Sequence, residues 1–222
     1  MKNIFKTILC VILGVFLMFS TVACNNNKDG ENPMPLDYNR PLDPTIDMNF
    51  EVKSNILVAY FSKTNTTADV ANKIAEYTGA DIFEIERKEP YPETYTPTTE
   101  EAKVEKSANS RPELARYLSD EVMMGYDTIF LGFPIWWHTA PMAVLSFLNY
   151  YDLSQKIVIT FCTAASSPIT ESTADVRNNT AAMVIEGRRF SHSDDAAIQT
   201  WIEGLNLNIE TFESTTKRGN MI

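Results

Sequence analysis

Residues 55–78, NILVAYFSKTNTTADVANKIAEYT, place a short apolar run directly before a polar loop and a helical pattern. The run over residues 56–61 has no polar alternation and is rich in β-branched and aromatic residues, which is typical of a strand buried on both faces. Apolar and small residues then recur at helical spacing over residues 68–78, and Gly79 is well placed to end this helix. Because a doubly buried strand usually belongs to a parallel sheet, the stretch favours an α/β fold.

The loop between this strand and this helix, Ser62-Lys63-Thr64-Asn65-Thr66-Thr67, has the composition of an anion site. Five of its six residues carry a hydroxyl or an amide, and none carries a carboxylate. The first turn of a helix leaves backbone N–H groups unpaired and carries a partial positive charge from the helix dipole. We therefore expect the loop to bind a phosphate without an arginine. In the simpler alternative, Thr66 or Thr67 only caps the helix and the other hydroxyls are solvated.

Two later strand predictions also end in loops of distinctive composition. A buried strand over residues 127–133 leads into residues 134–138, and a strand over 156–161 leads into the small and hydroxyl-bearing residues of 162–168. In open parallel sheets, ligands bind outside the carboxyl ends of the strands. We therefore expect the two tryptophans of the first loop to lie where a planar ring can stack on them. The alternatives for adjacent tryptophans are core plugs and anchors for a partner.

The rest of the chain supplies elements that alternate between helix and strand. An edge strand is predicted over residues 81–87, where apolar and charged residues alternate. Helices are predicted over residues 98–107, 112–119, 141–150 and 194–205, with another after Pro168, and a last strand over residues 181–185. Five strands alternating with helices predict a doubly wound α/β fold, a three-layer sandwich with a parallel sheet. Right-handed crossovers favour the strand order 2-1-3-4-5, in which the loops after strands one, three and four meet at one edge.

The connection over residues 88–119 is longer than a minimal crossover requires. Its first part is aromatic and rigid, since residues 90–97 hold three prolines together with Tyr91 and Tyr95. Long excursions in compact domains often border a functional site. The alternative is a decorated surface loop.

With these features, the chain resembles the FMN-binding, flavodoxin-like proteins over essentially its whole folded domain. The loop after the first strand is similar to the phosphate loop of that family, commonly (S/T)-x-T-(G/N)-x-T, with Asn65 at the position that is often glycine. Asparagine tolerates the left-handed backbone that such a position can require. The resemblance implies FMN as the cofactor and assigns its contacts to three sets of residues. The phosphate contacts would be Ser62, Thr64, Asn65, Thr66 and Thr67; the ring contacts Pro134, Ile135, Trp136, Trp137 and His138; and the ring-edge contacts Thr163, Ala164, Ala165 and Ser166.

Three functional interpretations stay open at this point. The resemblance implies electron transfer through the flavin, either to a redox partner protein or to a small-molecule electron acceptor, with no residue acting as an acid or base. An NAD(P)H-dependent quinone reductase is the near alternative, in which Tyr91 and Tyr95 cover the ring. A non-enzymatic binding protein that has lost FMN is the third, because Ala164-Ala165 stands where the family often has glycine.

Composition and charge exclude other classes of function. Hydrophobic residues make up 44% of the chain and aromatic residues 11%, as in a globular protein. The net charge of -10 and the lack of a basic stripe argue against nucleic acid as a partner, since phosphate backbones require clustered Lys and Arg. His138 and His192 lie far apart in the sequence without acidic or cysteine companions, so no metal site is predicted.

The first residues have the pattern of an export signal. Two lysines precede an apolar segment over residues 8–19, and small residues then lead to Cys24. This pattern resembles a bacterial lipoprotein signal, in which cleavage makes Cys24 the lipidated first residue, although Thr21 departs from the usual leucine-like residue. We expect an exported protein anchored to a membrane of the bacterial cell envelope. The alternative is an uncleaved anchor, for which the apolar segment is somewhat short.

The predicted organisation is a signal peptide over residues 1–23, a tether over 24–52, a domain over 53–206 and a tail over 207–222. The tether is polar and contains prolines, although Tyr38 and Ile46 could instead pack on the domain. Cys162 is the one cysteine of the predicted domain, so no disulfide can form within it. Its position in an apolar strand predicts a buried, inert thiol.

Overall fold

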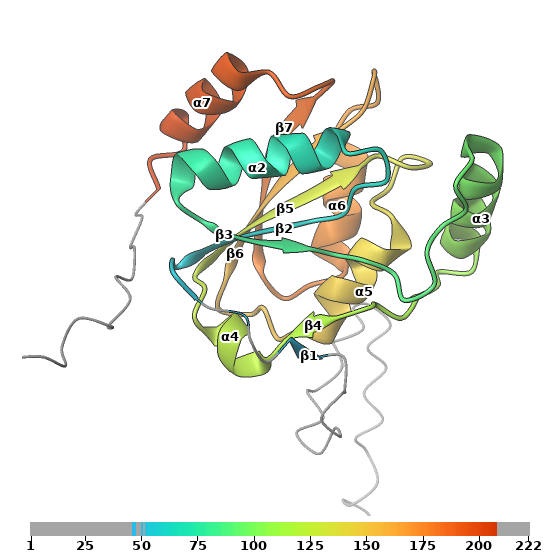
Figure 1. Cartoon of the computed structure of the whole chain (residues 1–222), viewed down its shortest axis with the longest axis horizontal. Coiled ribbons are helices and arrows are strands. Elements are labelled where there is room, and N and C mark those ends of the chain that lie inside the picture. Colours follow the sequence, from blue (N-terminus) through green and yellow to red (C-terminus); the bar gives the residue numbers. More distant parts are fainter. Residues whose placement is uncertain (1–45, 48–49, 51, 208–222) are drawn as a thin grey trace, which may run out of the picture. The chain divides into compact units, whose positions relative to one another are not determined.

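The computed structural model describes residues 46–47, 50 and 52–207, and a five-stranded parallel sheet forms its centre (Figure 1). The strands of this sheet are β2 (Ile56–Tyr60), β3 (Asp81–Glu84), β5 (Thr128–Pro134), β6 (Ile157–Thr163) and β7 (Met183–Phe190). Their order across the sheet is β3-β2-β5-β6-β7, and every neighbouring pair is parallel. Numbered along the chain, this is the order 2-1-3-4-5, so the predicted fold is confirmed.

Helices cover both faces of the sheet. The helices α2 (Thr66–Thr78) and α7 (Asp195–Gly204) contact each other on one face, and α5 (Met142–Tyr150) and α6 (Thr170–Asn178) lie on the other (Figure 1). The helix α2 ends at Gly79 in the left-handed conformation (φ 65°), as predicted.

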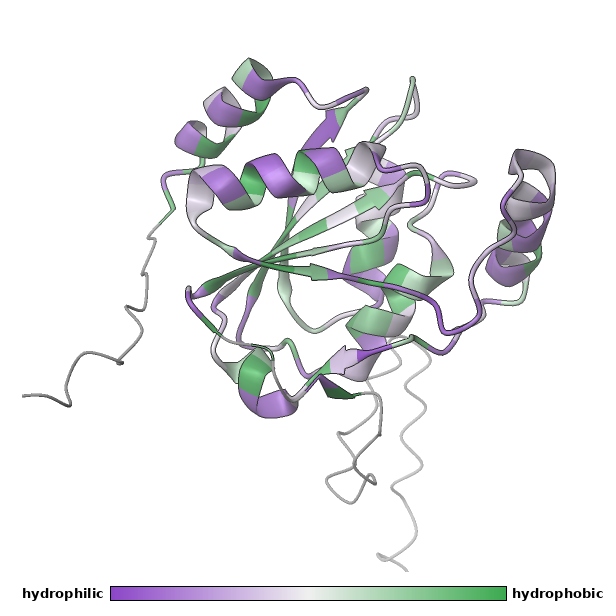
Figure 2. Cartoon of the chain, viewed as in Figure 1, coloured by the Kyte–Doolittle hydropathy of each residue, from purple (hydrophilic) through white to green (hydrophobic). Residues whose placement is uncertain are grey.

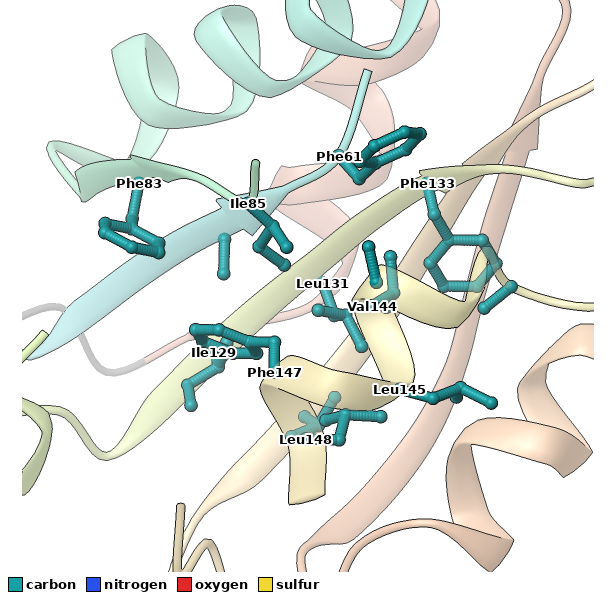
Figure 3. Packing of buried hydrophobic residues seen from close by; sticks show 14 of the residues in the cluster. Phe61, Phe83, Ile85, Ile129, Leu131, Phe133, Val144, Leu145, Phe147 and Leu148 are labelled. Carbon is teal, nitrogen blue, oxygen red and sulfur yellow. The ribbon is translucent and has the colours of Figure 1, made fainter. Parts of the chain in front are cut away.

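The strand β2 shows why the apolar run near residue 56 has no polar alternation. The side chains of Leu57, Ala59 and Phe61 join a cluster with α5, which Figure 3 shows from close by. The intervening side chains join a second cluster with α2 and α7. Both faces of β2 are therefore buried, and each fully buried Leu, Ile or Val contributes roughly 1.5–3 kcal/mol. In Figure 2 the central strands are mostly coloured as hydrophobic.

The predicted helix over residues 112–119 is wrong. The structure has a short strand there, β4 (Tyr117–Leu118), which pairs in parallel with β1 (Ile46–Asp47), and the five-residue helix α4 (Asp120–Met124) follows it. Leu114 forms an isolated bridge to Arg87 and is fully buried. These pairings join segments far apart in the sequence and override the local helical pattern.

Two strand predictions differ from the structure at their ends. The edge strand β3 is shorter than the predicted 81–87, and β7 continues well beyond the predicted 181–185. A register shift in the pairing of β6 with β7 lets β7 continue through Gly187. A Cβ at Gly187 would lie 2.0 Å from the carbonyl oxygen of Thr160, so this close approach requires glycine.

The described residues before β2 pack on the domain. Ile46, Phe50 and Val52 are partly buried against the cluster of Figure 3, which fits the alternative stated for Ile46. The predicted signal peptide, Cys24, most of the tether and residues 208–222 of the tail lie outside the described residues. In the part of the chain that the structure describes, no helix combines the length and the apolar character needed to cross a membrane.

Candidate functional site

A cleft of about 1120 Å³ lies at the carboxyl ends of β2, β5 and β6. It brings together the three loops that the sequence places at one edge of the sheet. The predicted site residues that line it are Thr64, Thr66, Thr67, Pro134, Ile135, Trp136, Trp137, His138, Thr163, Ala164 and Ala165. Ser62, Asn65 and Ser166 were also predicted and are not among its lining residues, while Lys63, Ser167 and Ser191 are.

The first loop leaves the N-terminus of α2 open toward the cleft. Asn65 occupies the N-cap position with φ 64°, a left-handed conformation, and its side chain makes no capping hydrogen bond. Thr66 and Thr67 are already the first helical residues, so neither is the N-cap of the simpler alternative. The unpaired N–H groups of a first helical turn, together with the hydroxyls of Thr64 and Thr66, can therefore bind an anion.

Two polar side chains of this loop bind elsewhere in the protein. The Oγ1 atom of Thr67 lies 2.7 Å from that of Thr163, and both residues are buried. Lys63 Nζ donates to the carbonyl oxygen of Tyr91 at 3.2 Å. The ammonium group is thus directed to the long connection after β3.

Trp136 combines a core contact with a place in the cleft wall. Its ring packs edge to face on Phe61 at 5.4 Å and on Tyr91 at 5.1 Å between ring centroids. The side chain is partly buried and also lines the cleft. Trp136 therefore packs against the core, as in the alternative stated for the two tryptophans, and also lines the cleft.

Trp137 and His138 form a strained turn at the rim of the cleft. Their φ angles are 52° and 67°, and the backbone N–H and carbonyl groups of Trp136 and Thr139 exchange two hydrogen bonds of 3.0 Å around them. Positive φ at both central positions is the geometry of a type I′ turn, which favours Gly and Asn. Residues held in such a region cost about 1–3 kcal/mol each and cluster at functional sites. No local sequence pattern predicted this turn.

The turn is held by α3 (Tyr95–Ser107), the helix of the long connection. Trp137 Nε1 donates to the carbonyl oxygen of Thr99 at 2.9 Å, and Lys106 Nζ donates to the carbonyl oxygen of Trp137 at 2.5 Å. Lys103 Nζ lies 5.3 Å from the centroid of the Trp137 ring. The ring of Trp137 is 43% exposed, so these contacts, rather than burial, fix it.

The connection after β3 itself forms one wall of the cleft, and Tyr95 is the one residue of this wall that was named from the sequence. The lining residues of this wall are Glu93, Thr94, Tyr95, Thr96, Thr98, Thr99 and Ala102. The length and the tyrosine and proline content of the connection were the available signal. Figure 1 shows α3 beyond the carboxyl ends of β2 and β3.

An ionic cluster fixes α3 to the connection before it. Arg87 Nη1 lies 2.6 Å from Glu101 Oε1 and 3.2 Å from Glu105 Oε1. The hydroxyl of Tyr91 donates to Glu105 Oε2 at 2.5 Å. Burial raises the pKa of the Glu105 carboxyl, which the Tyr91 hydroxyl and the Arg87 guanidinium partly offset.

The loop after β6 is fixed by an arginine that the sequence prediction left out. Arg189 Nη1 donates to the carbonyl oxygens of Ala164 and Ala165 at 2.9 and 3.1 Å. Neither alanine has a positive φ, so the loop adopts its conformation without requiring glycine. Next to this loop Cys162 is fully buried, as predicted, and burial raises its pKa to about 12.

No cluster of three or more His, Cys, Asp or Glu side chains suited to a metal ion occurs within the described ranges. The cleft instead combines hydroxyls, backbone N–H groups and aromatic rings. This donor set suits an organic ligand that carries a phosphate and a flat ring.

Comparisons with known proteins agree with this geometry. A protein-family model described as flavodoxin matches residues 55–205. The structure of a candidate flavoprotein from Bacteroides eggerthii is 31% identical, with a TM-score of 0.62 over 70% of this chain and 99% of that protein. One from Bacteroides uniformis is 33% identical, with a TM-score of 0.60 over 67% and 97%.

A more distant structure shares the fold. It is that of a flavoprotein from Lactobacillus acidophilus in complex with FMN, 20% identical, with a TM-score of 0.54 over 68% of this chain and 99% of that protein. Among curated protein sequences, none matches this chain.

Proposed function

The chain belongs to the flavodoxin family, and we propose that it is a redox flavoprotein that holds FMN in the cleft. The observation that carries the proposal is the uncapped N-terminus of α2, which opens onto a cleft lined by aromatic and small residues. The L. acidophilus flavoprotein of the same fold was crystallised with FMN, which supports this choice of ligand.

The residues of the cleft fit the parts of FMN. The first-turn N–H groups of α2, with the hydroxyls of Thr64 and Thr66, would hold the phosphate. Trp136 and the Ala164-Ala165 loop would contact the ring system. Bound FMN would supply one- or two-electron transfer, while the chain supplies binding, orientation and electrostatics.

Electron transfer to a partner protein and reduction of a small molecule are two versions of this function. The wall formed by α3 supports the second version, because it adds a surface beside the cleft on which a small molecule can bind. An NAD(P)H-dependent reductase therefore stands as the second candidate. A binding protein without FMN is the third, and the unstrained Ala164-Ala165 loop counts against it.

Titration of the purified full-length chain with FMN tests the proposal. Stoichiometric quenching of flavin fluorescence is the expected result, and a folded protein that leaves the fluorescence unchanged would overturn it. Circular dichroism of the same sample establishes that the protein is folded.

We also propose that the protein is a lipoprotein of the bacterial cell envelope, anchored through Cys24. The support is the export pattern of residues 1–23 and the small residues before Cys24. Metabolic labelling with a clickable fatty acid should label the wild type and leave Cys24→Ala unlabelled. Equal labelling of both would overturn the assignment.

A further inference from the structure

We propose that Arg189 is a positioning residue for FMN: it holds the loop after β6 in the conformation that meets the ring, and its positive charge favours the reduced cofactor. The inference rests on the proposed function, because this loop would contact the ring system. Arg189 itself does not line the cleft, whereas Ala164 and Ala165 do. The contacts of Arg189 therefore act on FMN through these two residues.

The hydrogen bonds of Arg189 set the direction of two peptide groups. Its Nη1 atom donates to the carbonyl oxygens of Ala164 and Ala165 at 2.9 and 3.1 Å. None of the described residues has a cis peptide bond, and in a trans peptide the carbonyl group and the following N–H group point in opposite directions. The N–H groups of Ala165 and Ser166 therefore point away from the guanidinium.

The N–H group of Ala165 is available to a ligand. That of Ala164 donates to the carbonyl oxygen of Phe190 at 3.0 Å, which fixes the start of the loop to β7. The N–H group of Ala165 has no hydrogen-bond partner among the residues that the structure describes, and Ala165 lines the cleft. The pyrimidine edge of a flavin carries carbonyl oxygens, which accept hydrogen bonds from such a donor. Arg189 thus orders a donor that the ring edge would use.

The positive charge of Arg189 is not neutralised by an ion pair. In the part of the chain that the structure describes, no carboxylate forms an ion pair with its guanidinium. A flavin that takes up two electrons and one proton carries one negative charge, which lies in its pyrimidine part. A cation behind the loop at that edge stabilises the reduced form more than the neutral, oxidised form. Arg189 should therefore raise the midpoint potential of bound FMN.

Arg188, the preceding residue of β7, provides a matched control. Its Nη1 atom donates to the carbonyl oxygen of Ala197 in α7 at 3.3 Å, and its guanidinium lies 5.5 Å from the centroid of the Phe190 ring. Successive side chains of a strand point to opposite faces of the sheet, so Arg188 is directed to α7 and Arg189 to the loop. Methionine at either position removes the same charge from the same strand.

Two measurements on full-length wild type, Arg189→Met and Arg188→Met test the proposal. Without FMN, hydrogen–deuterium exchange in the loop after β6 should be faster in Arg189→Met than in the other two proteins. With FMN, reductive titration beside a redox dye should give a lower midpoint potential in Arg189→Met. If the reduced form loses about tenfold more affinity than the oxidised form, this two-electron potential falls by about 30 mV. Arg188→Met should match the wild type in both measurements.

The outcomes separate this inference from the proposed function. Absence of FMN binding by the wild type overturns the proposed function and the role of Arg189 with it. FMN binding with equal midpoint potentials in Arg189→Met and Arg188→Met, or with equal exchange in the loop, overturns the inference alone.

If circular dichroism shows that Arg189→Met does not fold, Arg189→Lys takes its place. Lysine keeps the charge on a more flexible side chain without the planar guanidinium, so exchange in the loop should be faster and the midpoint potential close to the wild-type value. Exchange as slow as in the wild type would overturn the positioning role.

Discussion

Thr67 and Thr163 share a hydrogen bond of 2.7 Å between their Oγ1 atoms, and their residues are only 1% and 6% exposed. The bond joins the first turn of α2 to the end of β6, and so connects two of the three loops that surround the cleft. Because each hydroxyl satisfies the other, neither can be removed alone without leaving a buried polar group unpaired.

Thr163→Val should therefore lower the free energy of unfolding by about 1–3 kcal/mol. The double variant Thr67→Val/Thr163→Val should be less destabilised than the sum of the single variants, because it leaves no unpaired hydroxyl. Equilibrium urea unfolding of the wild type, the two single variants and the double variant measures this double-mutant cycle. Thr200→Val, at an exposed position of α7, is the control, and strict additivity would contradict the coupling.

Gly132 lies in the centre of β5 against the ring of Phe161. A Cβ at this position would be 2.1 Å from Phe161 Cζ, so Gly132→Ala should cost about 3 kcal/mol of stability or more through overpacking. Gly204→Ala is the matched control, because it meets nothing within 4 Å at the end of α7, and it should stabilise by up to about 1 kcal/mol. Thermal unfolding that gives equal midpoints for both variants would show that the sheet adjusts freely.

The sequence predicted the elements that depend on local patterns, and it did not predict the contacts between residues that lie far apart in the chain. The strand, loop and helix over residues 55–78 followed from local periodicity, because both faces of β2 are covered by helices. The contacts of Arg87 and Trp137 with α3, and of Arg189 with the Ala164-Ala165 loop, join residues far apart in the chain. No local pattern encodes such contacts, and for the same reason the pairing of β1 with β4 went unpredicted.

His138→Gly should be neutral or raise the free energy of unfolding by up to about 1 kcal/mol. His138 holds φ 67°, a conformation that costs an L-residue roughly 1–2 kcal/mol and glycine little. Its side chain is 65% exposed, so little packing is lost. His192→Gly, at an exposed position without positive φ, should instead be destabilising. Chemical denaturation compares the free energy of unfolding of the two variants. A larger decrease for His138→Gly than for His192→Gly would contradict backbone strain at His138.

The ionic cluster at α3 should make stability depend on pH. The pKa of Glu105 is raised by burial above its ordinary value of 4.5, so the folded protein binds the proton more tightly than the unfolded chain. The contribution of Glu105 to the free energy of unfolding is therefore complete below its pKa in the unfolded chain. It is lost as pH rises through its pKa in the folded protein. The stability of the wild type relative to Glu105→Gln should therefore fall as pH rises from 4.5.

Urea unfolding of both proteins between pH 4 and pH 7 checks this dependence. Glu113→Gln is the control, since the Glu113 side chain is 56% exposed, and its difference from the wild type should not follow the same trend. A difference between wild type and Glu105→Gln that is constant with pH, or that grows as pH rises, would contradict the assignment.

Substitutions of Trp136 and Trp201 distinguish a loss of packing from a loss of FMN binding. Trp136 packs on Phe61 and Tyr91 and lines the cleft, whereas Trp201 packs on Phe130 and Phe190 and does not line it. Each alanine variant loses aromatic packing, so both should be destabilised. The FMN dissociation constant should nevertheless rise about tenfold or more in Trp136→Ala and stay near the wild-type value in Trp201→Ala. Fluorescence titration of folded samples measures both dissociation constants. Both variants lose core packing, so this loss alone cannot separate their FMN affinities. Equal dissociation constants would therefore show that Trp136 does not contact FMN.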